Sequence, residues 1–161
     1  MINSLLTWLV YPKKRIGTNA ILFKYIKYSQ IDRRTLKPSA SNFGDENLSC
    51  DWDRYSTAEE TRVRIGKQFI HGSTSQFKNE NEYFVCRLKV EKLLNLDPKQ
   101  LFIHDPIFNL PEKKGIPNNQ SHSLIVGKKE KDKAQLKARG QLAILSEWAI
   151  FDENEFNNFF A

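Results

Sequence analysis

The sequence has few of the residues that build the common cofactor and metal sites. It has two cysteines, Cys50 and Cys86, which form no Cys-x-x-Cys pair, and its seven glycines are scattered. Zinc sites need closely spaced thiolates or imidazoles, and phosphate-cradling loops need glycines at fixed spacings. The Gly-x-Ser-x-Gly turn that exposes a nucleophilic serine is also absent. We therefore expect no cofactor and no bound metal, and we interpret both cysteines as small core residues.

Long apolar runs are absent as well. A short apolar cluster over residues 5–10 is followed by Pro12, Lys13, Lys14 and Arg15. A secretory signal carries its positive charges before the apolar stretch, and a membrane span needs about 20 apolar residues. We therefore predict a cytoplasmic protein with no membrane contact, in which residues 1–18 are a leader or a packing segment.

The composition is that of a globular protein. Its 161 residues are 40% hydrophobic and 12% aromatic, which is enough to form a core in one domain. Segments rich in β-branched and aromatic residues predict strands at 20–26, 48–52, 82–90, 100–104 and 122–126.

Two helices are predicted, one between these strands and one after the last of them. Ser56 and Glu59 have the spacing of a capping box, which opens a helix that ends near Phe69. A second helix over 131–148 is predicted because small and apolar residues recur at helical spacing, namely Ala134, Ala138, Leu142, Leu145 and Ala149. Strands and helices without regular alternation indicate an α+β fold with a small, mostly antiparallel sheet. We place this single compact domain at 19–151, followed by an acidic aromatic tail at 152–161.

The net charge of +6 is concentrated in two basic blocks. Residues 1–40 carry eight lysines and arginines against one acid, and residues 111–146 carry eight against three. Such blocks are typical of a polyanion partner, although solvated lysines that favour solubility are the alternative. If RNA or DNA binds, the two blocks must meet on one face. The candidate nucleic-acid-binding residues are Lys13, Lys14, Arg15, Lys24, Lys27, Arg33, Arg34, Lys128, Lys129, Lys131, Lys133, Lys137 and Arg139.

Two histidines that flank a long loop are the candidates for catalysis. His104 ends one predicted strand and His122 begins the next, so both imidazoles can lie at the same end of the sheet. Such a pair can supply acid and base in phosphodiester chemistry, whereas the alternative is that each only hydrogen-bonds a turn. A second cluster, Asp51 and Asp53, lacks further ligands for a cation, and we interpret Asp53 as a cap of the turn before Ser56.

Taken together, the sequence favours a small basic binding module over an enzyme. We predict that it engages nucleic acid or a partner protein, and its motif-poor character resembles that of small accessory proteins of bacterial genomic islands or defence systems. The alternative function is a metal-independent ribonuclease or transferase that uses His104 and His122. A third possibility is an inhibitory protein that docks through the acidic aromatic tail.

Overall fold

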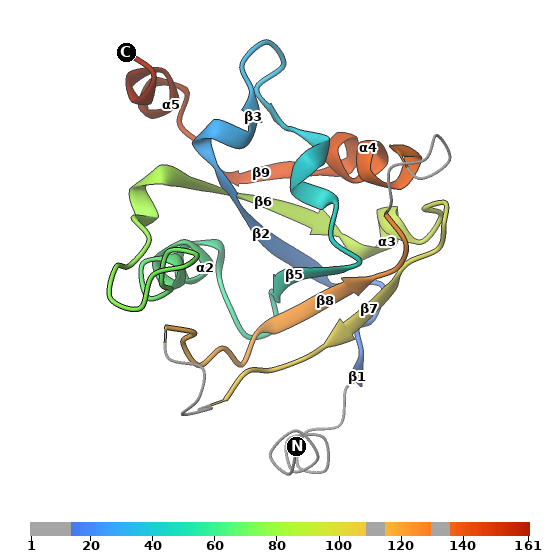
Figure 1. Cartoon of the computed structure of the whole chain (residues 1–161). Helices are drawn as coiled ribbons and strands as arrows, with labels where there is room; N and C mark the ends of the chain where they lie inside the picture. The colour runs from blue at the N-terminus through green and yellow to red at the C-terminus, as the bar shows by residue number, and fades with distance from the viewer. Residues whose placement is uncertain (1–13, 109–114, 130–135) are drawn as a thin grey trace.

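The computed structural model describes residues 14–108, 115–129 and 136–161, and a seven-stranded sheet forms its centre (Figure 1). Its strand order is β1–β7–β8–β5–β2–β6–β9, and every neighbouring pair is antiparallel. A separate hairpin pairs β3 with β4. The α+β prediction is therefore confirmed. The strands are β1 (Lys14–Arg15), β2 (Ile21–Lys27), β3 (Ile31–Asp32), β4 (Lys37–Pro38), β5 (Asn47–Trp52), β6 (Tyr83–Lys89), β7 (Leu101–His104), β8 (His122–Val126) and β9 (Glu147–Ile150).

Alternation of side chains along the strands gives the sheet two faces. One face carries Leu22 and Ile26 of β2 with Cys86 of β6, all fully buried. It is covered by α4 (Leu136–Leu145), α3 (Val90–Leu93) and the 3-10 turn η2 (Ala40–Phe43), which add side chains to the same apolar cluster. The core thus lies between this face and these three elements. Both cysteines are free and buried, as their interpretation as core residues requires.

The other face of the sheet is covered in part by α2 (Ala58–Ile65), which packs on β2 and β6. Its capping box is formed by Thr57 and Glu60, so the prediction of Ser56 and Glu59 was wrong by one residue. Ser56 is buried, and its hydroxyl hydrogen-bonds Thr57 O and lies 3.3 Å from the Thr61 hydroxyl. The helix ends at Ile65 rather than near Phe69.

The predicted helix over 131–148 was wrong at its C-terminal end. Helix α4 stops at Leu145, and the next residues form β9, an edge strand on β6. Salt bridges to Glu147 from Arg87 and two lysines favour the strand, and Trp148 Nε1 donates to the Leu36 carbonyl at 2.9 Å. Tertiary contacts therefore override the helical spacing. The start of the predicted helix falls partly outside the described residues.

The acidic aromatic tail forms α5 (Glu153–Phe159), capped by Asp152. Phe156 is 1% exposed and belongs to the core cluster, while Glu155 bonds the Tyr28 hydroxyl and the Arg62 guanidinium. The tail is thus packed against the domain rather than separate from it. Two further 3-10 turns are η1 (Tyr28–Gln30) and η3 (Glu80–Glu82).

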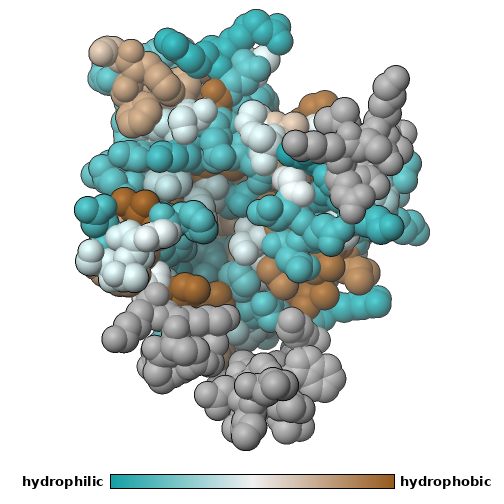
Figure 2. Space-filling model, viewed as in Figure 1, coloured by the Kyte–Doolittle hydropathy of each residue, from teal (hydrophilic) through white to brown (hydrophobic). Residues whose placement is uncertain are grey.

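The face of the molecule seen in Figure 2 is mostly hydrophilic, with apolar side chains in small separate groups. None of the helices in the described ranges has the length and apolarity that a membrane crossing requires.

Candidate functional site

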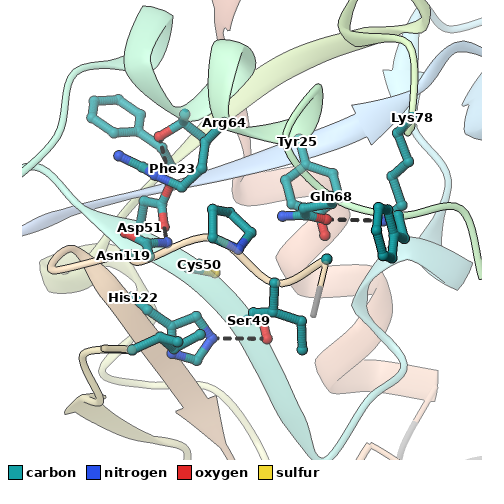
Figure 3. Close-up of a pocket in the computed structure, with 16 residues that line it drawn as sticks. Phe23, Tyr25, Ser49, Cys50, Asp51, Arg64, Gln68, Lys78, Asn119 and His122 are labelled. Carbon is teal, nitrogen blue, oxygen red and sulfur yellow. Dashed lines mark hydrogen bonds and ion pairs between the residues drawn. The ribbon is translucent and has the colours of Figure 1, made fainter. Parts of the chain in front are cut away.

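A cavity of about 300 Å³ lies on the α2 side of the sheet (Figure 3). Its floor comes from β2, β5 and β8, and its walls come from α2, from the segment 68–78, from Ile107 and from the segment 115–119. The polar lining residues are Tyr25, Ser49, Asp51, Thr61, Arg64, Gln68, Lys78, Asn119 and His122. The apolar ones include Phe23, Phe69, Ile107, Ile116 and Pro117.

Sheet register brings the central polar residues together. Ser49 and Asp51 are two apart on β5 and therefore share a face, and Asp51 lies directly opposite His122 of β8. The neighbouring strand β2 pairs Phe23 with Asp51, which adds an aromatic ring to the same floor. Three strands that are far apart in the sequence thus build one surface.

The Asp51 carboxylate holds the walls of the cavity to its floor. One oxygen accepts from the Thr61 hydroxyl at 2.8 Å and from the Arg64 guanidinium, and the other accepts from Asn119 Nδ2 at 2.7 Å. The aspartate is only 7% exposed, and a buried charge is tolerated when it is paired and hydrogen-bonded in this way. Asp53, by contrast, accepts from the Ile21 amide and so bonds the start of β2, not the turn before Ser56 as predicted.

A serine and a histidine in the cavity are within hydrogen-bonding distance of each other. The Ser49 hydroxyl lies 3.2 Å from His122 Nε2, and His122 Nδ1 lies 2.7 Å from the backbone oxygen of Asp105. A carbonyl oxygen only accepts, so Nδ1 carries the hydrogen; in the neutral ring Nε2 is then an acceptor, and the serine donates to it. The Asp105 carboxylate is 3.6 Å from the same Nδ1.

Positive charge gathers around the ring of Tyr25, which also lines the cavity. Lys78 Nζ lies 5.6 Å from the ring centre and donates to Gln68 Oε1 at 3.0 Å, while Lys24 Nζ lies 5.4 Å from the same ring. Burial, together with the charges of Lys24 and Lys27, lowers the pKa of Lys78. The ammonium of Lys78 therefore sits in a partly dry and positively charged environment, where a bound anion stabilises it.

The two histidines predicted for catalysis lie on opposite faces of the sheet. His104 pairs with Ser123, the residue next to His122, and successive side chains point to opposite faces. Its ring stacks on Tyr55 with centres 5.0 Å apart, and Nε2 donates to the Gln120 carbonyl. Of the two, the cavity is lined by His122 alone. The structure therefore does not bring the predicted pair together.

The predicted basic residues are spread over both edges of the sheet. Lys14 and Arg15 form the edge strand β1, whereas Arg33 and Arg34 follow β3 in the hairpin whose Leu36 bonds β9, the other edge. Within the described ranges, the first basic block thus does not gather in one patch. Figure 1 shows β1 and β3 at opposite ends of the molecule.

The second basic block is partly structural. Lys129 is fully buried and donates to three backbone carbonyls, those of Glu46, Ile125 and Gly127. Arg139 packs against Gly44, and Lys128 is exposed. Lys13, Lys131 and Lys133 lie outside the described residues, as does the side chain of Lys137.

Several residues of the cavity were missed by the sequence analysis. Ser49 and Lys78 come from a segment with nearly balanced charge, and no motif marks them. The usable signal was the alternation over residues 47–52, which places Ser49 and Asp51 on one face of a strand. Among the described residues, no group of three His, Cys, Asp or Glu side chains is placed to hold a metal ion. Comparisons with protein-family models, curated proteins and solved structures return no match.

Proposed function

We propose that this protein binds single-stranded nucleic acid, with one nucleotide in the cavity beside α2. The observation that carries the proposal is that Tyr25 and Lys78 both line this cavity, with Lys78 Nζ 5.6 Å from the centre of the Tyr25 ring. Lys24, next to Tyr25 on β2, brings a second ammonium to 5.4 Å from the same ring. Proteins that bind single strands combine cations that follow the phosphates with aromatic rings on which bases stack. The cavity offers both within one site.

The size and lining of the cavity support this ligand. About 300 Å³ is at the lower end of small-ligand sites, which suits one base or sugar rather than a duplex. The rings of Phe23 and Phe69 and the side chain of Ile116 supply an apolar surface for a base. A phosphate near Lys78 would also relieve the repulsion that Lys24 and Lys27 exert on it.

Fluorescence anisotropy with a labelled single-stranded RNA 12-mer, and with DNA of the same sequence, tests the proposal. We expect Lys78→Gln to weaken binding and to reduce the slope of log K against log salt by about 0.7, the value for one lost phosphate contact. The matched control is Arg34→Gln, which removes a predicted basic residue from the distant hairpin and should leave both quantities unchanged.

Two results would contradict the proposal. One is the absence of binding by the wild type at low salt, where electrostatic contacts are strongest. The other is an equal loss in the Lys78 and Arg34 variants, because it would show a diffuse charge effect rather than a site. Phe69→Ala reports on base stacking, and we expect a loss of about 1–3 kcal/mol from it.

A further inference from the structure

We propose that Ser49 and His122 are a nucleophile and its general base, and that they cleave a phosphate ester bound in the cavity. The choice of substrate class rests on the proposed binding of phosphate-bearing chains, whereas the pairing of the two side chains does not. Ser49 is exposed, so its hydroxyl is open to a ligand, and it lies 3.2 Å from His122 Nε2. Hydrogen bonding of a nucleophile to a base, which is in turn oriented by a third group, is the arrangement that activates serine.

The third group is supplied by Asp105. Its backbone oxygen accepts from His122 Nδ1 at 2.7 Å, which fixes both the tautomer and the ring orientation. Its carboxylate lies 3.6 Å from the same nitrogen and stabilises the imidazolium that forms when the ring takes a proton. The histidine side chain is 14% exposed, so its rotation is restricted by packing as well.

The charges of the cavity favour a phosphorus centre over a carbonyl. Attack on a phosphate ester spreads negative charge over the oxygens around phosphorus, and catalysis of this step depends on cations placed near them. The cavity is lined by Arg64 and Lys78. Asp51 orients the Arg64 guanidinium, while the Lys78 ammonium donates to the neutral side-chain amide of Gln68.

The reaction balances with water as the only co-substrate. The Ser49 oxygen attacks phosphorus as its proton passes to His122 Nε2, and the bond from phosphorus to the leaving alkoxide breaks. The imidazolium then protonates that alkoxide, which leaves a phosphoserine diester or monoester. Water attacks the same phosphorus, gives its proton to His122, and the Ser49 alkoxide leaves and recovers that proton. No metal and no oxidant takes part in these steps.

A fluorophosphonate probe tests the pair on the full chain without any nucleic acid. Attack by Ser49 forms an oxygen–phosphorus bond and expels fluoride, so the protein gains the mass of the probe less hydrogen fluoride. We expect peptide mapping to place this adduct on Ser49 and Ser49→Ala to lose it. His122→Asn keeps an N–H for the Asp105 carbonyl but removes the base, so labelling should slow by about 100-fold or more.

Matched controls separate this pair from general reactivity. Ser73→Ala and His71→Asn change a loop serine and an exposed loop histidine, and both should label at the wild-type rate. His104→Gln should also label normally, because that ring lies on the other face. Circular dichroism checks that each variant is folded, and Ser49→Ala alone decides the outcome if His122→Asn unfolds.

The proposal is overturned if the folded wild type is not labelled, if the adduct maps elsewhere, or if folded His122→Asn reacts at the wild-type rate. Labelling at Ser49 without RNA binding would refute the proposed function and keep the nucleophile. RNA binding without labelling would support the proposed function and refute the assignment of Ser49 as a nucleophile.

Discussion

The buried ammonium of Lys129 makes the free energy of unfolding depend on pH. The contribution of this one group can be measured by comparing the wild type with Lys129→Met. The side chain is 0% exposed and lies among backbone carbonyls, and burial lowers its pKa from the ordinary 10.5 to about 8. Between these two values the unfolded chain binds more protons than the folded chain. The free energy of unfolding therefore rises with pH in this window.

The magnitude follows from the two pKa values. With 10.5 in the unfolded chain and about 8 in the folded one, the contribution of Lys129 grows by about 2 kcal/mol between pH 7 and pH 9.5. Other groups titrate in the same range, so the quantity to measure is a difference between two proteins. The free energy of unfolding of the wild type, minus that of Lys129→Met, should be about 2 kcal/mol larger at pH 9.5 than at pH 7.

Urea unfolding followed by circular dichroism at both pH values gives this difference. Lys128→Met is the matched control, because Lys128 is the exposed neighbour of Lys129. The free energy of unfolding of the wild type, minus that of Lys128→Met, should be the same at both pH values. A constant difference between the wild type and Lys129→Met would refute the reasoning. It would mean that the ammonium of Lys129 is solvated in the folded state.

Three further predictions concern stability and reactivity. Asp51→Asn should cost about 3 kcal/mol in urea unfolding, because Arg64 keeps a poorly solvated charge without its partner, and a cost under 1 kcal/mol would contradict the role given to Asp51. Thr57→Ala should cost about 1 kcal/mol through the lost cap, whereas Ser56 is not the cap and its substitution should leave the N-terminus of α2 formed. Burial raises the pKa of both Cys50 and Cys86 to about 12, so a disulfide reagent at pH 8 should react with neither until the protein unfolds; rapid reaction of the folded protein would be the opposite result.

Most of the sheet could be predicted from the sequence, because its strands carry their signal locally. The segment 122–126 has the predicted bounds of β8, and the apolar run at 83–89 is β6. Strand β9 could not be found this way. Its residues continue the helical spacing of α4, and only the contacts of Glu147 and Trp148 with distant segments select the extended conformation.

The candidate site was predictable only in part, because its geometry depends on register. The sequence places His104 and His122 at one end of neighbouring strands, and they do lie there. Which face each imidazole occupies depends on a one-residue offset in the pairing, and this offset puts His122 beside Asp51 and His104 beside Tyr55. Sequence spacing alone does not contain that information.

The net charge of a segment is also a poor guide to the place of an unpaired cation, because many charged side chains are already in ion pairs. The middle of the chain is almost neutral by count, yet its Arg64 is paired with Asp51 and its Glu82 with Lys27 of the first basic block, while Lys78 bonds a neutral amide. Conversely, Lys129 in the second basic block is buried and donates to three backbone carbonyls. What attracts an anion is the charge left after such pairing and its burial, and this is the reason why the proposed phosphate contact is Lys78.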